Sequence, residues 1–258
     1  MESQQAKAEN RAILITGAGK RLGRAMADHL AREGWHVVLH VHTATAEAEA
    51  QCTALHAEGY RASWVCGDLS QPDAADAVFE RARAQAGMLH ALINNAAGFS
   101  LQPILPDLQA AALWQLNVES PKRLTECLDQ HLRFASNAQP GCVINLLDQR
   151  IAHAEDTTPY TRTKRALAAF TIQEAHRFAP RLRLMGLAPG ALLVPPTPET
   201  AEPAGTFPLG FRPTPLDLAQ TASFVLNAPF LTGQILYVDS GQHLAWKIEK
   251  EESGTSKA

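Results

Sequence analysis

The sequence predicts an α/β fold: a single Rossmann-type, doubly wound domain with a seven-stranded parallel sheet and helices on both faces. Short apolar runs alternate along the chain with helical patterns, as they do in βαβ units. The runs are apolar at consecutive positions, which is typical of strands buried on both faces. A glycine-rich stretch at 16–23 follows the first run and opens the first helix.

Each expected strand is a short apolar run, and the runs cover 12–16, 35–41, 62–66, 89–94, 142–147, 182–188 and 234–239. The expected helices run from Leu22 to Gly34, up to Gly59, and over 72–86, 107–135, 158–178 and 215–227. In the first helix, apolar residues recur at helical spacing until Gly34, a residue that commonly ends helices. Pro72 suits an early helical position because its missing N–H would have no partner there.

The chain has 258 residues, and residues 11–246 are expected to form one domain. The segments 1–10 and 247–258 are polar and poor in apolar residues, so both are expected to be flexible. The segment 191–215 is rich in proline and matches neither strand nor helix. A long irregular connection in a compact domain is usually functional, so we interpret it as a substrate-covering loop, with a plain surface insertion as the alternative.

The composition excludes several classes of partner. Hydrophobic residues make up 46% of the chain and the net charge is −3, so no nucleic-acid partner is expected. The N-terminus lacks an apolar targeting segment and no apolar run has the length of a membrane span, so no membrane association is expected. The scattered cysteines favour free thiols in a reducing, cytoplasmic location over disulfides or a metal site; they are Cys52, Cys66, Cys127 and Cys142.

Tyr160 and Lys164 are candidate catalytic residues in the stretch 148–164. Their spacing of four places them on one face of a helix. A lysine ammonium beside a phenol favours the phenolate, so the pair predicts a lowered tyrosine pKa and a group able to exchange protons near neutrality. The alternative is a partly exposed helix pair without function.

The glycines at 17, 19 and 23 predict a phosphate-binding turn, since they let the backbone approach a phosphate at a helix N-terminus. The alternative is a structural turn. At the end of the second strand no acidic residue stands where a ribose-binding carboxylate would indicate NAD. Arg21, with His42 and Thr43, can instead meet a 2′-phosphate, which favours NADP(H) over the alternative of solvated surface residues.

Further polar residues follow the third and fourth strands. Asp68 would lie at the carboxyl edge of the sheet, near an adenine, although a lone Asp there is also a common helix cap. The stretch 94–98 (NNAAG) brings small residues and amides to the same edge. Asn117 lies inside a predicted helix, where Asn is unfavourable, and this suggests either a buried polar role or simple solvation.

In combination, the motifs at 16–23 (TG-x₅-G), 94–96 (NNA) and 188–190 (APG), with Asn117 and Tyr160-x-x-x-Lys164, resemble the short-chain dehydrogenase/reductase family. The resemblance spans about 11–244. It implies that Tyr160 is the general acid, that Lys164 lowers its pKa and holds the nicotinamide ribose, and that Asn117 completes a proton relay. The implied cofactor-binding residues are Gly17, Gly19, Lys20, Arg21, Leu22, Gly23, His42, Thr43, Asp68, Leu69, Asn95, Ala96, Ala97, Tyr160, Lys164, Pro189 and Gly190.

One departure points to a branch of this family. Asp148 stands where the family usually has a serine, and Arg21 replaces the middle glycine. Both features resemble the pteridine reductases and dihydromonapterin reductases. That resemblance implies that Phe99 stacks on a pterin, while Asp148 works with Tyr160 to protonate ring nitrogens. Ala97 and Gly98 depart from a serine-containing form of the 94–98 motif.

The sequence therefore predicts an NADPH-dependent reductase of a pterin-type substrate. Phe99, Asp148 and Tyr160 are the expected substrate-binding residues. Two alternatives remain open: a reductase of another carbonyl, such as a 3-oxoacyl thioester or a ketone, and a non-catalytic NADP(H)-binding sensor. The family resemblance implies that the helices at 107–135 and 158–178 pair across two-fold axes, and we expect a homotetramer, with a dimer as second choice. The second of these helices is also more apolar than one buried face requires.

Overall fold

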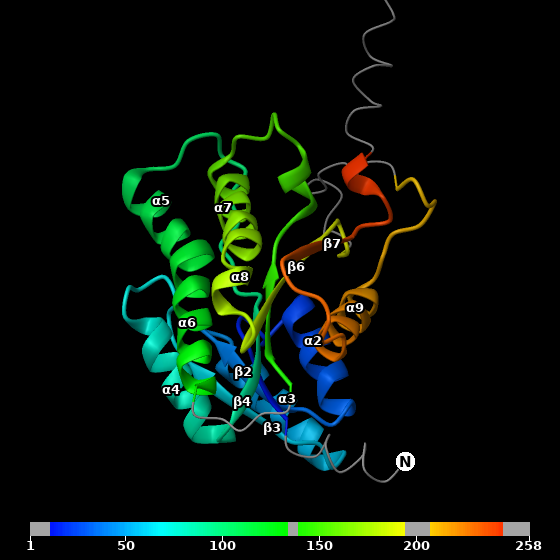
Figure 1. The fold of residues 1–258 in the computed structure, drawn as a ribbon. Coiled ribbons are helices and arrows are strands. Elements are labelled where there is room, and N and C mark those ends of the chain that lie inside the picture. The colour runs from blue at the N-terminus through cyan, green and yellow to red at the C-terminus, as the bar shows by residue number, and fades with distance from the viewer. Residues whose placement is uncertain (1–10, 134–138, 194–206, 245–258) are drawn as a thin grey trace, which may run out of the picture.

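The computed structural model describes residues 11–133, 139–193 and 207–244. The predicted flexible termini, 1–10 and 247–258, lie outside these ranges, as do residues 245–246 at the end of the predicted domain. Residues 194–206, the greater part of the predicted substrate loop, lie outside them too. The element labels below are those of Figure 1.

A parallel sheet of seven strands forms the centre of the domain, in the order β3-β2-β1-β4-β5-β6-β7. This order confirms the predicted doubly wound fold, because the chain winds outwards from β1 in both directions. The strands are β1 (Ala12–Ile15), β2 (His36–Val41), β3 (Ala62–Cys66), β4 (Leu89–Asn94), β5 (Gly141–Leu146), β6 (Leu182–Pro189) and β7 (Gln234–Val238).

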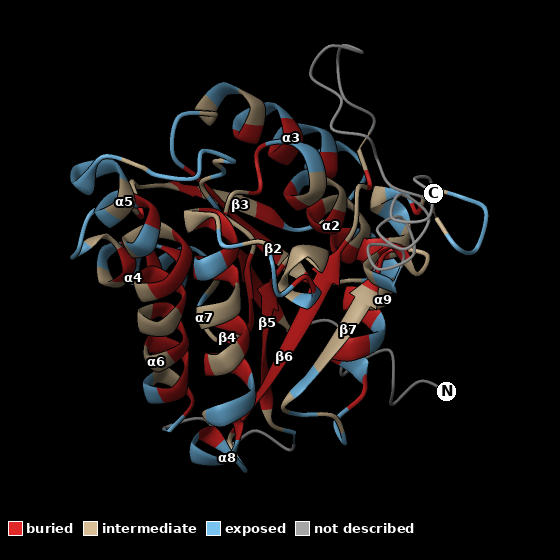
Figure 2. Cartoon of the chain, turned by 90° about the horizontal axis from the view of Figure 1, so that it is seen from above, coloured by how far each residue is buried: buried red, intermediate tan, exposed pale blue. Residues whose placement is uncertain are grey.

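Helices cover both faces of the sheet (Figures 1 and 2). One face carries α2 (Arg21–Arg32), α3 (Thr45–Ala57) and α9 (Pro215–Asn227). The other face carries α4 (Ala74–Ala86), α5 (Asp107–Trp114), α6 (Ser120–Leu132), α7 (Pro159–Gln173) and α8 (Ala175–Phe178). None of the described helices is both long and apolar enough to cross a bilayer.

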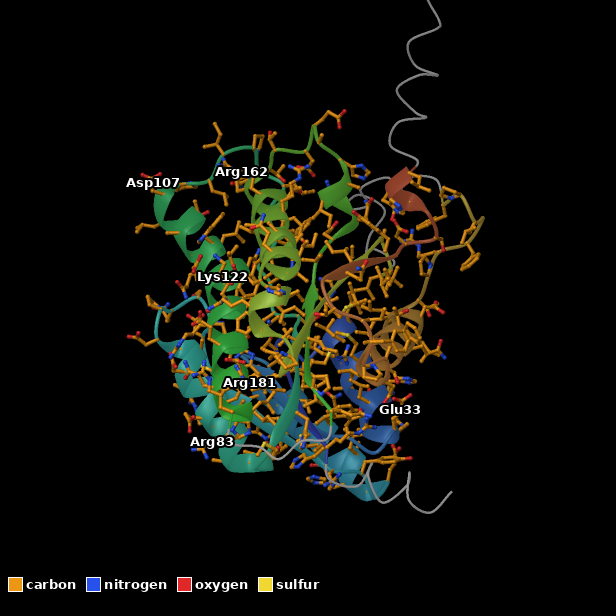
Figure 3. All side chains as sticks on the ribbon, in the orientation of Figure 1. Glu33, Arg83, Asp107, Lys122, Arg162 and Arg181 are labelled. Carbon is orange, nitrogen blue, oxygen red and sulfur yellow. The ribbon has the colours of Figure 1, made fainter. Side chains whose placement is uncertain are left out.

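The strands divide their side chains between two hydrophobic cores. In β1, Ile13 and Ile15 pack with residues of α2 and α9, whereas Leu14 packs with residues of α4 and α6. All three side chains are fully buried. Since successive side chains of a strand point to opposite faces, a strand between two helical layers must be apolar throughout, as the sequence is. Charged side chains such as Glu33, Arg83 and Lys122 lie at the periphery (Figure 3).

Two predicted helices are interrupted. The helix predicted at 107–135 contains a π-helical turn, Gln115–Glu119, between α5 and α6, and residues 134–135 are outside the described ranges. Pro121 has no N–H to donate to the carbonyl four residues earlier, which belongs to Asn117, so a regular α-helix cannot continue through this turn. The helix predicted at 158–178 ends at Gln173, and the separate short helix α8 follows.

A buried polar ladder connects the sheet to α7. The Asn94 side-chain amide donates to Oδ1 of Asn145 (2.8 Å), and the Asn145 amide donates to Oγ1 of Thr171 (2.9 Å). Asn94 and Asn145 are paired residues on β4 and β5. Because buried polar groups require partners, the ladder fixes α7 against the carboxyl half of the sheet.

We predict that Asn145→Ala lowers the free energy of unfolding by about 1–3 kcal/mol, since it leaves the buried groups of Asn94 and Thr171 short of a partner. Urea denaturation followed by circular dichroism measures the loss. The control is Gln85→Ala on the exposed face of α4, expected within about 0.5 kcal/mol of the parent. Equal stability of the two variants would contradict the structural role of the ladder.

Candidate active site

Tyr160 and Asp148 meet at the carboxyl edge of the sheet. The Tyr160 hydroxyl donates a hydrogen bond to Oδ2 of Asp148, at 2.8 Å. Oδ1 of Asp148 accepts the backbone N–H of Arg150 at 2.9 Å. Both carboxylate oxygens are therefore engaged, one of them by the phenol that the sequence identifies as the general acid.

Two different segments supply this pair, and local capping holds them together. Asp148 follows β5 and caps a 3-10 turn (Gln149–Ala152), whereas Tyr160 lies in the first turn of α7. Oδ1 of Asp156 accepts the Thr158 N–H at the start of α7 (3.1 Å), and its Oδ2 accepts from the Arg150 guanidinium (3.1 Å). Asp156 thus links the turn that carries Asp148 to the helix that carries Tyr160.

Lys164 lies one turn beyond Tyr160 and is 3% exposed. Its ammonium donates to the Leu146 carbonyl oxygen at 2.7 Å and lies 5.8 Å from the centroid of the Tyr160 ring. Burial lowers the pKa of Lys164 to about 8, with Asp148 acting in the opposite direction. A lysine this deep in the fold is a functional candidate, because structural roles rarely need a buried amine.

The expected lowering of the Tyr160 pKa was wrong. Burial raises the pKa of this phenol well above its usual value, and the adjacent Asp148 carboxylate raises it further. Burial also raises the pKa of Asp148, although the N–H of Arg150 and the Tyr160 hydroxyl favour its charged form. Tyr160 therefore keeps its proton at neutral pH, and burial shifts Asp148 towards its protonated form.

Phe99 lies beside the pair and is 61% exposed, so it is not a core residue. Its ring meets the Tyr160 ring edge to face, with centroids 4.8 Å apart. The Asn117 side chain accepts the N–H of Gly98 (2.8 Å) and donates to the Gly98 carbonyl (3.0 Å), which fixes the backbone next to Phe99. An exposed aromatic ring held in place this way offers a flat apolar face to a ligand.

Asn117 is buried, so solvation does not explain it. Its amide also donates to Oγ1 of Thr163 (3.0 Å), whose hydroxyl donates to the Tyr160 carbonyl (2.6 Å). These contacts reach the backbone of Tyr160, and the part of Asn117 in a proton relay stays a prediction. The sequence analysis did not identify Thr163, although its position three residues after Tyr160 and one before Lys164 was a usable signal.

The glycine turn after β1 is tightly packed. Gly17 has a φ of +64°, and a Cβ on Gly23 would lie 2.4 Å from the Gly17 carbonyl oxygen. A Cβ on Gly19 would lie 2.9 Å from the Val41 side chain. Arg21, at the position of the family's middle glycine, has a φ of +55°, a left-handed conformation unusual for a side chain with a Cβ.

Thr16 joins this turn to the segment after β4, and the sequence analysis missed it. Its hydroxyl oxygen accepts the backbone N–H groups of Asn95 and Ala96, both at 2.9 Å. The Asn95 amide donates back to the carbonyls of Thr16 (2.7 Å) and Gly17 (3.0 Å). The threonine directly before the first glycine was the available signal. Ala97, the next residue, is exposed at the same edge.

The residues predicted to meet a 2′-phosphate are exposed where α2 begins and β2 ends. Arg21 and Thr43 are exposed, and the His42 ring is 3.9 Å from the Asp68 carboxylate. Lys20 forms an ion pair with Glu47 (2.7 Å). The first turn of α2 contains no acidic residue. Because helix N-termini favour anions, the glycine turn and these cations fit the phosphates of a dinucleotide.

The remaining predicted cofactor residues lie at the same edge. Oδ1 of Asp68 accepts from the hydroxyl (2.7 Å) and the N–H (3.0 Å) of Ser70, and these bonds hold the pKa of Asp68 below its usual value. Leu69 is buried and Leu22 is partly buried. Pro189 ends β6, and a Cβ on Gly190 would lie 2.6 Å from the Gln242 side chain. The described residues contain no group of three or more His, Cys, Asp and Glu side chains suited to a metal ion.

Comparison with known proteins identifies the family. Residues 11–203 match the model of the short chain dehydrogenase family. The chain belongs to this family of oxidoreductases.

The relatives differ in what they are named for. A 3beta-hydroxysteroid dehydrogenase from Eggerthella lenta is 28% identical over 92% of this chain and 95% of its own length. A cis-4-hydroxycyclohexanecarboxylate dehydrogenase from Sinomonas cyclohexanicum is 30% identical over 90% of this chain and 96% of its own. Among solved structures, the FolM alternative dihydrofolate reductase 1 from Brucella canis, complexed with NADP, matches with a TM-score of 0.85 and 28% identity, over 93% of this chain and 96% of that one.

We predict that Lys164→Met makes the protein more stable at pH 7. The folded protein holds the Lys164 proton only up to a pKa of about 8, whereas the usual value is 10.5, so below pH 8 the unfolded state is favoured by its easier protonation. The gain should be on the order of 1–3 kcal/mol and should shrink as the pH rises above 8 towards 10.5. Urea unfolding of variant and parent between about pH 7 and pH 9.5 measures it.

Lys122→Met is the matched control, because Lys122 lies at the surface in an ion pair with Glu119. Its stability difference from the parent should stay small and independent of pH over the same range. A Lys164→Met protein that is less stable than the parent at pH 7 would show that the buried ammonium stabilises the fold.

Proposed function

We propose that the protein is an NADPH-dependent reductase of a pterin-type substrate, such as a dihydropterin or dihydromonapterin. The observation that carries the proposal is the hydrogen bond between the Tyr160 hydroxyl and the Asp148 carboxylate. It places a carboxyl group that can return a proton beside the phenol that donates one, where a serine hydroxyl would provide only a weak acid.

The cofactor assignment rests on the carboxyl edge of the sheet. The glycine turn leaves no room for a Cβ on Gly23, the first turn of α2 contains no acidic residue, and Arg21 and His42 are exposed beside it. The solved structures of FolM from Brucella canis and from Brucella suis supply a parallel, since each is a complex with NADP. Bound at this edge, NADPH would supply the hydride.

The protein's own task is then to bind the ring and protonate it. Phe99 presents an exposed aromatic face for stacking, next to the Tyr160 hydroxyl. Reduction of a ring C=N adds a proton to nitrogen, and the Tyr160 phenol donates it. Asp148, whose pKa is raised by burial, either returns a proton to Tyr160 or protonates a second ring nitrogen. Lys164 lies beneath the pair and would hold the nicotinamide ribose.

A reductase of another carbonyl is the second candidate, because two relatives are named as dehydrogenases of a hydroxysteroid and of a hydroxycyclohexanecarboxylate. Such an enzyme orients its substrate with a neutral hydroxyl in the family pattern, and here a carboxylate stands in that place. The third candidate, a non-catalytic NADP(H)-binding sensor, does not require Asn117, Tyr160 and Lys164 to be kept and brought together.

The four cysteines are unpaired, which agrees with the cytoplasmic location we propose.

We predict that Asp148→Ser and Asp148→Asn each lower kcat for dihydropterin reduction by about 10²–10⁴-fold while NADPH binding persists. Both variants remove the group that holds the second proton. Tyr160→Phe should be at least as damaging, because it removes the phenolic donor and keeps the ring. The measurement is kcat across pH for the parent and the three variants. An Asp148→Asn enzyme with unchanged rate and pH profile would exclude Asp148 from proton transfer. An Asp148→Ser enzyme that keeps or improves its reductase activity and extends it to ketones would show that Asp148 only occupies the position of the serine.

Arg21→Gly should weaken NADPH binding by about 10–100-fold, because a charge-assisted contact of about 1.5–3 kcal/mol is lost. The affinity for NADH, which lacks the 2′-phosphate, should stay unchanged and serves as the internal control. Since glycine adopts a φ of +55° without strain, the variant should also be more stable than the parent by about 1 kcal/mol. Fluorescence titration and thermal unfolding test the two effects. Equal affinities of the parent for NADPH and NADH would refute the cofactor assignment.

We also propose that the protein is a homotetramer. The proposal is supported by large apolar side chains that are exposed on two helices of the chain. Leu108 (87% exposed) and Trp114 (42%) are on α5, and Ile172 (53%) is on α7. Exposed large apolar side chains are common at subunit interfaces. Light scattering at micromolar concentration should give four times the chain mass, and Leu108→Glu should reduce it. A monomer mass for the parent would overturn the proposal.

A further inference from the structure

His40 is a buried side chain at the carboxyl end of β2 that the proton-transfer chemistry does not use. It is 2% exposed, and its ring lies between two backbone segments that are distant in sequence. Gly17 donates its N–H to Nδ1 of the ring (3.3 Å), and Nε2 lies 3.0 Å from the carbonyl oxygen of Gly67. The His40 ring therefore bridges the glycine turn after β1 and the segment after β3.

The partners fix the tautomer of the ring. A peptide N–H is always a donor, so the bond from Gly17 requires an unprotonated Nδ1. The proton must then be on Nε2, from which it is donated to Gly67. An imidazolium would place its own N–H against that of Gly17. Burial lowers the pKa of His40 to about 4, with His42 and Arg81 acting in the same direction and Asp68 and the Gly67 carbonyl opposing, so the ring is neutral near pH 7.

Both segments border the half of the site proposed for the adenosine and phosphates. Gly17 opens the turn in which a Cβ on Gly23 would collide with the backbone. Gly67 directly precedes Asp68 and is itself confined, since a Cβ there would lie 2.5 Å from the Val78 side chain. The backbone of His40 adds to the junction, because its carbonyl accepts the N–H of Ala18 (2.9 Å).

We propose that His40 is a positioning residue of the cofactor site, whose neutral ring holds the glycine turn and the segment after β3 at the separation required by the adenosine half of NADP(H). The inference rests on the proposed cofactor, and it assigns His40 no part in proton transfer. It follows that His40 controls cofactor affinity, whereas Asp148 and Tyr160 control the rate of the chemical step.

The test measures binding without turnover, using NADPH and 2′,5′-ADP, which carries the adenosine and the 2′-phosphate alone. His40→Leu removes both hydrogen bonds and should weaken both ligands by about 10–100-fold, while kcat at saturating NADPH changes by less than about threefold. His40→Asn places an acceptor near the position of Nδ1 and should recover part of the affinity. If His40→Leu does not fold, His40→Asn and His40→Gln, each able to replace one bond, carry the test and should bind more weakly than the parent.

His90→Leu is the matched control. His90 lies at the amino end of β4, and its Nδ1 accepts the backbone N–H of Ala12 at 3.3 Å, so it makes the same kind of bond at the opposite edge of the sheet. This variant should lose stability and keep its affinity for both ligands. Unchanged affinities in the His40 variants, or equal losses in His90→Leu, would overturn the inference alone. A parent protein that binds neither ligand would overturn the proposed function with it.

Discussion

The hydrogen bond between Tyr160 and Asp148 sets the chemistry that this site can perform. Both groups are largely removed from water, and burial raises the pKa of each. The Asp148 carboxylate raises the pKa of the phenol further, so Tyr160 stays protonated near pH 7, and a buried carboxylate without a hydrogen-bond donor would be costly. The Tyr160 hydroxyl and the Asp148 carboxylate form a hydrogen bond of 2.8 Å beside the exposed Phe99 ring.

The surrounding fold keeps Asp148 and Tyr160 next to each other in a buried place. Asp148 follows β5, and Tyr160 lies in the first turn of α7. Asp156 links these two segments through hydrogen bonds with Thr158 and Arg150. The Asn94–Asn145–Thr171 ladder fixes α7 further down its length. Lys164 is buried below the pair at some cost in stability, since its pKa falls to about 8. A local loss of stability within a well-packed fold is characteristic of functional sites.

The groups proposed for proton transfer and those proposed for cofactor binding lie on different halves of the sheet. The proposed proton-transfer pair lies beyond β5, whereas the glycine turn, His40 and Gly67 lie at the carboxyl ends of β1, β2 and β3 on the other half of the sheet. Thr16 and Asn95 join the two halves, because they connect the turn after β1 to the segment after β4. On the roles proposed here, affinity for the cofactor and the rate of proton transfer would respond to separate substitutions.

The fold could be predicted from the sequence because strands buried on both faces are apolar at every position, as the 12–16 run shows. The motifs likewise located Tyr160, Lys164 and the glycine turn, whose signals are local. The π-helical turn was missed because helical periodicity continues through it, and Pro121 was its only mark. The direction of the Tyr160 pKa could not be inferred from a spacing of four, since burial and Asp148, twelve residues earlier, determine it. The contacts of His40 span 23 and 27 residues, and no local pattern encodes them.

The most direct test of the account is the substrate preference of the unaltered protein. Initial rates of NADPH oxidation would be measured side by side with a 7,8-dihydropterin, a quinonoid dihydropterin, a 3-oxoacyl thioester and a simple ketone. The carboxylate–phenol pair predicts turnover of at least one pterin and little or none of the ketone and the thioester. Rapid reduction of the ketone or thioester with inert pterins would contradict the assignment of Asp148 and Tyr160 as donors to a ring nitrogen.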